Sequence, residues 1–159
     1  VLSRIAKSLG KEDSLDEMLA SSFIVSDDNA HAVHPNHPEF SDPTNKTLLG
    51  KGIVVKHHAN FNYTTDALSS SILKGVWKTN GVKYQDFYMR SDLPCGGTLG
   101  AISSSQVSVT SIDVGLPQLA MHSACETAAI SDVGEGIKAV TAFYSVAFSS
   151  DGDGKITVL

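Results

Sequence analysis

An acid- and histidine-rich segment follows the first apolar run of the chain. Residues 27–37 contain three histidines and two aspartates, directly after a run, residues 23–25, that has the β-branched content of a buried strand. Carboxylates and neutral imidazoles are both good zinc ligands. The segment therefore predicts either a metal site at the end of a strand or a polar loop whose imidazoles bond to their own backbone. The residues of this segment alone leave both interpretations open.

Polar side chains also follow the later strand-like runs. Lys56 and Arg90 end the second and third predicted strands, and His122 lies after the fourth. In an open α/β sheet, ligands bind beyond the carboxyl ends of the strands. We therefore expect these three side chains and Asp28 to converge at one edge of the sheet.

Strand-like and helix-like segments alternate along the chain. Apolar runs rich in β-branched or aromatic residues predict strands, and apolar residues at helical spacing predict helices. The expected strands are residues 22–26, 52–56, 84–90 and 107–114, and the expected helices are residues 1–10, 14–19, 65–80, 99–106 and 131–148. This alternation predicts an α/β fold, with a mostly parallel layered sheet and helices on both faces.

Local signals mark several of the predicted helix ends. Ser14 and Glu17, three residues apart, resemble a capping box, and Asp66 is expected to cap the helix that follows it. Gly10 can end the first helix. Trp77 is expected in the core.

Composition and charge narrow the classes of partner. The 159 residues suit about one domain, with 42% hydrophobic residues and a net charge of -5. The absence of a basic patch argues against nucleic acid, and no apolar run approaches the ~20 residues of a membrane helix. The first residues are amphipathic and lack the apolar core of a signal peptide. Because the chain starts without Met and in a helical pattern, we expect it to begin inside a longer protein.

The cysteines and the C-terminal acids carry weaker signals. Cys95 and Cys125 form neither a disulfide framework nor a metal knuckle, and we expect both to be reduced in a cytoplasmic protein, with a vacuolar or lysosomal location as the alternative. Residues 151–155 resemble part of a calcium loop. Because Lys155 replaces a ligand and no bidentate Glu follows, we interpret them as a flexible tail.

Four motifs occur in one order along nearly the whole chain. They are residues 26–36 (SDDNAHAVHPN), residues 52–56 (GIVVK) with Tyr63, residues 90–100 (RSDLPCGGTLG) and residues 113–123 (DVGLPQLAMHS). Together they resemble the aspartyl aminopeptidase family, whose members are dinuclear zinc exopeptidases.

The resemblance implies a fold and part of an active site. It implies that residues 1–159 are the C-terminal segment of a zinc-exopeptidase-like catalytic domain, which makes this chain a partial domain. Asp28 would bind one of two zinc ions and His122 the other. The family's first His, bridging Asp and Glu-Glu pair have no counterpart in this sequence. The general-base Glu and the oligomerisation domain are therefore expected upstream of Val1, and no catalytic residue is expected within this chain.

The resemblance also implies contacts with the substrate. His31 would face the substrate, and Lys56 would pair with an acidic side chain, since the family prefers N-terminal Asp or Glu. Tyr63 would donate a hydrogen bond to the same substrate. The N–H groups of Gly96 and Gly97 would bind an anion at a helix start. From the residues alone, Lys56 could equally be a solvated lysine, and the glycines a tight turn that needs positive φ.

The sequence therefore predicts part of a metalloprotease: a zinc aminopeptidase that hydrolyses peptides with an acidic N-terminus and forms a homo-oligomer at full length. One ligand for each metal is too few for zinc, which prefers about four, so this chain alone is expected to be inactive. The alternative is a truncated, non-catalytic α/β module that binds a peptide or a partner. An upstream His, Asp and Glu-Glu pair in the same gene would separate the two.

Overall fold

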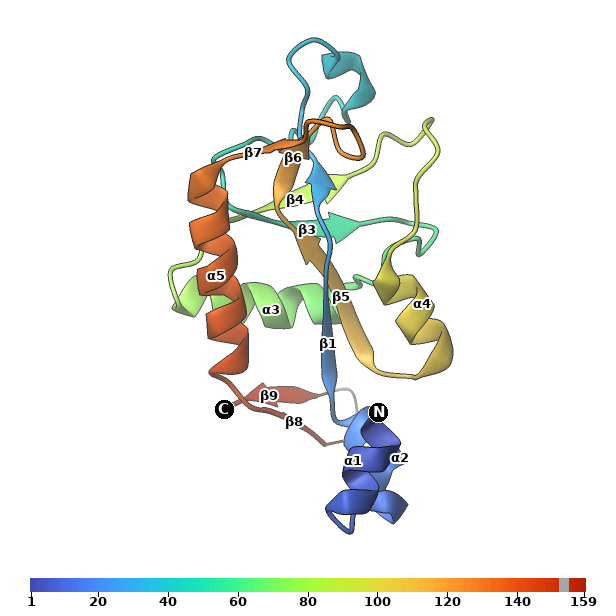
Figure 1. Ribbon diagram of the computed structural model, residues 1–159. Helices are drawn as coiled ribbons and strands as arrows, with labels where there is room; N and C mark the ends of the chain where they lie inside the picture. The colour runs from blue at the N-terminus through green and yellow to red at the C-terminus, as the bar shows by residue number, and fades with distance from the viewer. Residues whose placement is uncertain (152–154) are drawn as a thin grey trace.

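The computed structural model describes residues 1–151 and 155–159 (Figure 1). The helices are α1 (Leu2–Ser8), η1 (Glu12–Ser14), α2 (Leu15–Ala20), η2 (Pro38–Phe40), α3 (Ala67–Thr79), α4 (Leu99–Gln106) and α5 (Ile130–Tyr144). The strands are β1 (Phe23–Asp27), β2 (Ala30–His31), β3 (Ile53–His57), β4 (Tyr84–Tyr88), β5 (Thr110–Gly115), β6 (Pro117–Leu119), β7 (Thr127–Ala128), β8 (Phe148–Ser150) and β9 (Ile156–Val158).

The main sheet has four strands in the order β1-β5-β3-β4. The outer pairs, β1 with β5 and β3 with β4, are parallel, which confirms the mostly parallel α/β sheet. The central pair is antiparallel: Val55 lies opposite Val114. The sequence analysis did not predict this antiparallel pair, because the polarity of a strand relative to a distant neighbour leaves no local pattern. The carboxyl ends of all four strands consequently do not share one edge, so the expected convergence at a single edge was wrong, although Lys56 does contact Asp28.

Helices cover both faces of the main sheet, as predicted. Alternate residues of β5 point to opposite faces. Ile112 and Val114 pack in the core beneath α3 and α5, whereas Asp113 between them faces α4. Gly100 of α4 lies so close to the Asp113 carboxylate that a Cβ at position 100 would stand 2.6 Å from its Oδ2 atom. Figure 1 shows α4 on the opposite side of the sheet from α5.

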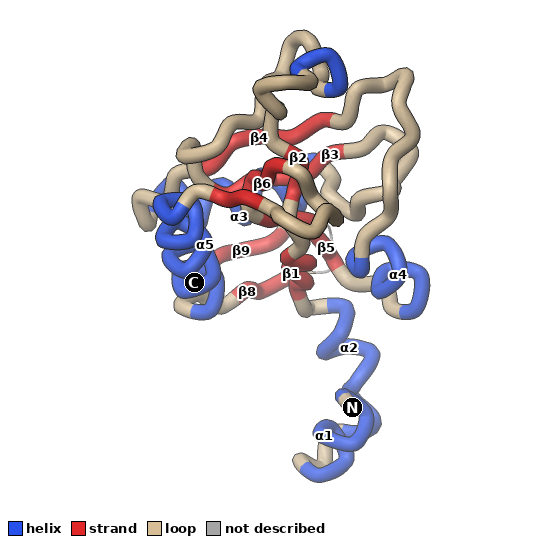
Figure 2. The backbone as a smooth tube through the Cα atoms, turned by 45° about the horizontal axis from the view of Figure 1, so that its top comes forward, coloured by secondary structure: helices blue, strands red, loops and turns tan. Residues whose placement is uncertain are grey.

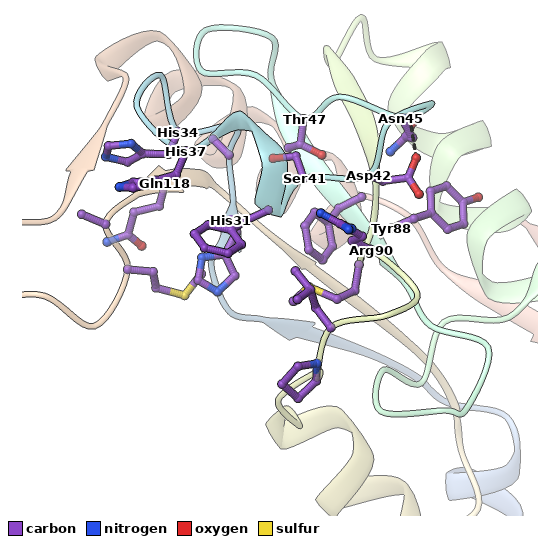
Figure 3. Close-up of a pocket in the computed structure, with 18 residues that line it drawn as sticks. His31, His34, His37, Ser41, Asp42, Asn45, Thr47, Tyr88, Arg90 and Gln118 are labelled. Atoms are coloured by element: carbon purple, nitrogen blue, oxygen red, sulfur yellow. Dashed lines mark hydrogen bonds between the residues drawn. The ribbon is translucent and has the colours of Figure 1, made fainter.

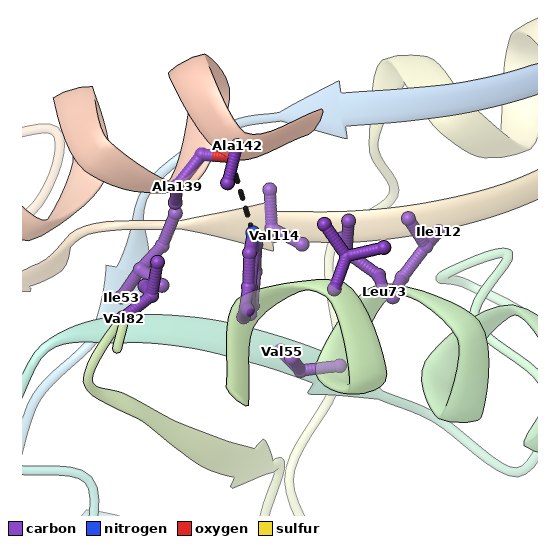
Figure 4. Packing of buried hydrophobic residues seen from close by; sticks show 10 residues of the cluster. Ile53, Val55, Leu73, Val82, Ile112, Val114, Ala139 and Ala142 are labelled. Atoms are coloured by element: carbon purple, nitrogen blue, oxygen red, sulfur yellow. Dashed lines mark hydrogen bonds between the residues drawn. The ribbon is translucent and has the colours of Figure 1, made fainter. Parts of the chain in front are cut away.

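The larger core lies between the sheet and the pair of helices α3 and α5 (Figure 4). Trp77 is buried there, as predicted, and its indole Nε1 donates to the Ala139 carbonyl oxygen at 3.2 Å. This bond ties α3 to α5, two helices that are far apart in the sequence. A second, smaller core on the other face contains Ala30, Val54 and Tyr63, together with Phe87.

A second sheet, in the order β2-β6-β7, continues the chain beyond β1 and β5 (Figure 2). Its strands are two or three residues long, too short to show a period-2 pattern, and the sequence analysis missed them. β2 pairs in parallel with β6, which places His31 opposite Gln118. This small sheet holds the histidine-rich segment against the segment that leads to His122.

Several predicted element ends need correction. Asp66 forms a reciprocal capping box with Ser69, whereas Ser14 makes no side-chain cap bond. The fourth strand begins at Thr110 rather than at residue 107, and α5 ends at Tyr144, so that Phe148 belongs to β8. The last difference arises because β8 turns back to pair with β9 instead of extending the helix.

The N-terminal helices α1 and α2 lie outside the layered core (Figure 1). Leu2, Ile5 and Leu9 share a helical face as expected, but that face is exposed in the described part of the chain. Of the calcium-like segment 151–155, residues 152–154 lie outside the described residues. Within the described ranges, no helix is long and apolar enough to cross a membrane.

Candidate active-site segment

Asp28 and Lys56 meet beside the end of β5. The backbone N–H of Asp28 donates to the Val114 carbonyl oxygen at 2.9 Å, and Val114 lies opposite Val55, the neighbour of Lys56. The antiparallel pairing of β3 with β5 therefore brings Lys56 to Asp28. Gly115 permits this arrangement, because a Cβ at position 115 would overlap the Asp28 backbone.

The Lys56 ammonium is surrounded by oxygen atoms. Its Nζ lies 3.4 Å from Asp28 Oδ2, 3.3 Å from the Asp28 carbonyl oxygen and 3.2 Å from that of Asn29. The Lys56 side chain is only 3% exposed, whereas that of Asp28 is 50% exposed. The interpretation of Lys56 as a solvated strand-end lysine was therefore wrong. Asp28 keeps an open side that faces away from the lysine.

Tyr63 covers the other side of the same ammonium group. Lys56 Nζ lies 4.6 Å from the centre of the Tyr63 ring, which is a cation–π contact. Burial raises the pKa of Tyr63 far above its ordinary value, and a hydrogen bond with Cys95 and the negative charges of Asp113 and Asp28 raise it further. The phenol therefore stays neutral and can donate a hydrogen bond.

Asp113 holds the segment that carries Tyr63. Its Oδ2 accepts hydrogen bonds from Thr64 N at 2.6 Å and from Thr64 Oγ1 at 2.9 Å, and its backbone N–H donates to Thr65 Oγ1 at 2.9 Å. Asp113 had no predicted role. An acidic residue between Ile112 and Val114 was the available signal, since a charge in an apolar strand requires partners, and the side chain is indeed fully buried.

An amide bridge joins the two motifs of the small sheet. Asn29 Nδ2 donates to Gln118 Oε1 at 2.8 Å, and Leu116 N donates to Asn29 Oδ1 at 3.2 Å. The sequence analysis missed this bridge, because the two amides are 89 positions apart. The bridge fixes the register of β2 against β6 and hence the position of His31.

The segment with His122 has an unusual backbone. Ala120 and His122 both adopt left-handed conformations, with φ of 52° and 69°. The His122 N–H donates to Glu126 Oε1 at 2.6 Å, which supports the turn. Strained residues of this kind cost on the order of 1–3 kcal/mol each and cluster at functional sites. The imidazole of His122 is exposed.

His31 lies near both Lys56 and His122. Its pKa is lowered by burial first, and then by the positive charges of His122 and Lys56. These influences favour the neutral imidazole, which can both donate and accept a hydrogen bond. The three predicted site residues are thus close enough to interact electrostatically.

A pocket of about 450 Å³ opens beside His31 (Figure 3). His34 belongs to this wall, and its ring is tilted against that of His37 with ring centres 5.7 Å apart. Arg90 also lines the pocket, where its guanidinium is paired with Asp92 at 2.7 and 2.8 Å. Arg90 therefore belongs to the pocket wall and not to the group of residues that surround the Lys56 ammonium.

Gly96 and Gly97 precede α4 without a left-handed backbone, so the interpretation as a tight turn with positive φ was wrong. Open space surrounds both positions. Gly97 lines a shallow groove that it shares with Asp27 and Asp28. These two carboxylates would repel an isolated anion, and anion binding at the glycines stays a prediction.

The donor chemistry fits zinc, although the set is incomplete. Asp28 offers a half-exposed carboxylate and His122 an exposed imidazole, both of which suit zinc. Among residues 1–151 and 155–159, no group of three or more His, Cys, Asp or Glu side chains could hold a metal ion. Zinc binding at Asp28 and His122 would therefore need further ligands.

Comparison with known proteins identifies the family. A model of the aminopeptidase I zinc metalloproteases (M18) matches residues 1–144. This chain belongs to the M18 family. A probable M18 family aminopeptidase 2 of Clostridium novyi is 44% identical over 147 residues, which are 92% of this chain and 34% of that protein. An aspartyl aminopeptidase of Dictyostelium discoideum is 37% identical over 130 residues, which are 82% of this chain and 27% of that protein.

Solved M18 structures share the fold. A chain of the Ape4 and Nbr1 complex is 38% identical with a TM-score of 0.85, over 90% of this chain and 27% of that one. A chain of the S. cerevisiae mApe1 dodecamer is 26% identical with a TM-score of 0.75, over 90% of this chain and 33% of that one. The predicted partial zinc-exopeptidase-like fold is thus confirmed. The chain spans about a third of the length of these M18 relatives.

Proposed function

We propose that this chain is part of a zinc aminopeptidase that removes acidic N-terminal residues from peptides. The observation that supports it best is the buried Lys56 ammonium, 3.4 Å from the Asp28 carboxylate, in a chain of the M18 family. A positive charge beside a proposed metal ligand suits a substrate with a negative side chain. The name of the Dictyostelium relative, an aspartyl aminopeptidase, supports the same substrate class.

In this proposal, Asp28 and His122 each bind one of two zinc ions. When bound, the zinc ions would polarise the scissile carbonyl and lower the pKa of the attacking water. The general base that takes the proton from this water would be a Glu outside this chain. Lys56 holds Asp28 through Oδ2, which leaves Oδ1 free for the metal.

The acidic side chain of the substrate would lie between three groups. Lys56 would supply the positive charge, Tyr63 a neutral hydroxyl donor, and His31 a neutral imidazole donor. Since the Lys56 ammonium already contacts two carbonyl oxygens, its position is set before the substrate arrives. Such preorganisation lowers the entropy lost on binding.

We further propose that residues 1–159 are the C-terminal segment of the catalytic domain of a longer, homo-oligomeric protein that lies in the cytoplasm. The relatives support this, since the chain spans about a third of their length and one solved relative is a dodecamer. The intact mass and subunit number of the native protein test these proposals.

The decisive experiment compares Asp28→Asn, His122→Gln and Asp16→Asn in the full-length protein that carries this sequence. Asp16→Asn is the control, because Asp16 is exposed on α2. We expect the first two variants to lose hydrolysis of Asp-peptides by at least about 100-fold and to bind less zinc, while the control keeps both. Full activity and zinc content in both site variants would refute the metal assignment. Absence of zinc and hydrolysis in the unaltered protein would favour the non-catalytic module.

A further inference from the structure

We propose that the pocket beside His31 binds the side chain of the second residue of the peptide substrate and selects an apolar one, such as leucine or phenylalanine. This inference rests on the proposed aminopeptidase function. The pocket would contact the residue that follows the cleaved bond, whereas Lys56 and Tyr63 would contact the residue that is removed.

The pocket shares His31 with the proposed site. His31 belongs to both, because it lines the pocket and is close enough to His122 and Lys56 for their charges to affect it (Figure 3). Gln118, the partner of His31 across β2 and β6, lines the pocket too. A peptide whose first residue lies against Lys56 would therefore meet the pocket on the far side of the His31 ring.

The pocket walls are mainly apolar. Apolar side chains that line it come from η2, β4 and the loops after β4 and β6, and they include Phe40, Phe87, Met89, Leu93, Pro94 and Met121. Thioether side chains are flexible and polarizable, so Met89 and Met121 can adapt to apolar groups of different shape. This lining predicts selection by hydrophobic contact rather than by one fixed geometry.

Three polar side chains of the pocket already have partners. Arg90 is paired with Asp92, and Asp42 Oδ1 accepts hydrogen bonds from Thr44 and from the Asn45 backbone at 2.7–2.8 Å. Gln118 is bound to Asn29 at 2.8 Å. A charged substrate side chain beside these three groups would lose its hydration without gaining a free partner there, which costs free energy. The pocket thus disfavours acidic and basic second residues.

The size of the pocket agrees with this occupant. Its volume of about 450 Å³ falls in the range of small-molecule sites, roughly 300–1,000 Å³. That volume exceeds one side chain and leaves room for the adjoining peptide backbone. A segment of the same polypeptide or a second subunit is the rival occupant, and the experiment separates it from the substrate.

The test uses the full-length protein and four peptides, Asp-Leu-Gly, Asp-Phe-Gly, Asp-Ser-Gly and Asp-Glu-Gly. We expect kcat/KM for the first two to exceed that for the last two by about tenfold or more. Leu93→Asp places a charge in the pocket wall on a loop, and it should reduce this preference to less than about threefold. Leu48→Asp is the matched control, because Leu48 is exposed and lies outside the pocket. The control should keep the preference.

Equilibrium binding provides a second readout that does not require hydrolysis. The same peptides with a methylene-amine in place of the scissile amide are titrated calorimetrically into the three proteins. Tighter binding of the Leu and Phe peptides, lost only in Leu93→Asp, supports the pocket. Equal cleavage and equal binding of all four peptides overturn it and leave the proposed function standing, as expected if another segment fills the pocket. Absence of cleavage with preserved apolar selectivity in binding refutes the function alone.

Discussion

Two clusters of acidic and basic side chains lie on opposite faces of β3, only one residue apart. On one face, Lys56 is buried against Asp28, whose carboxylate is 50% exposed. On the other, Asp86 Oδ1 accepts from His57 Nε2 at 2.7 Å and from Lys74 Nζ at 2.5 Å. In the first cluster the acid contacts one base and keeps an open side, whereas in the second cluster the acid is shared by two bases.

This difference separates a binding role from a structural one. Asp86 is shared by β4, β3 and α3, so its bonds tie the edge of the sheet to a helix. Asp28 is tied to β3 on one side only and faces a groove on the other. A carboxylate with an open side, such as that of Asp28, can bind a metal or a substrate. A carboxylate bonded to two basic side chains, such as that of Asp86, is suited to stabilising the fold. Variants in the two clusters should accordingly affect different measurements.

The largest effect on substrate preference is expected for Lys56→Met in the full-length protein. Loss of a buried, hydrogen-bonded charge costs about 2–5 kcal/mol, so the preference for Asp over Ala at the peptide N-terminus should fall about 30-fold or more. Steady-state kinetics with paired Asp- and Ala-peptides measure this ratio. Lys51→Met, at an exposed lysine, is the control. An unchanged ratio in Lys56→Met would remove Lys56 from substrate recognition.

Asp86→Asn should change stability instead of specificity. The amide keeps the shape but loses the charge that His57 and Lys74 share, which is expected to cost about 1–3 kcal/mol of unfolding free energy. Tm should fall, while the Asp-over-Ala ratio stays within about twofold of the unaltered protein. Asp92→Asn, in an exposed ion pair, should shift Tm much less. A changed substrate ratio in Asp86→Asn would contradict the division between the clusters.

The smallest effect concerns acid stability. Burial raises the pKa of Asp86, but hydrogen bonds from His57 and Lys74 and their charges outweigh burial and hold the pKa below its ordinary value of 3.8. A lowered carboxyl pKa contributes stability above pH 3.8 that is lost as pH falls through the folded-state value. Tm measured from pH 5 downwards should therefore fall less steeply in Asp86→Asn than in the unaltered protein. Parallel curves would indicate that other carboxylates determine acid unfolding.

The sequence by itself determined the elements with strong local patterns. The runs that became β1, β3 and β4 and the periodicity of α3 and α4 predicted these elements to within a few residues. The Asp66 cap and the buried Trp77 were also predicted, because both depend on neighbours a few positions away or on hydrophobicity alone. The four motifs identified the M18 family before any contact was known.

Only the tertiary structure decided how these parts meet. The antiparallel pairing of β3 with β5 brings Lys56 to Asp28, and the short pair β2 and β6 brings His31 to Gln118. The pocket and the Asp113 contacts with Thr64 depend on the same long-range pairings. Strand polarity and the pairing of two-residue strands are determined by packing between distant segments, and such packing leaves no periodic trace in the sequence.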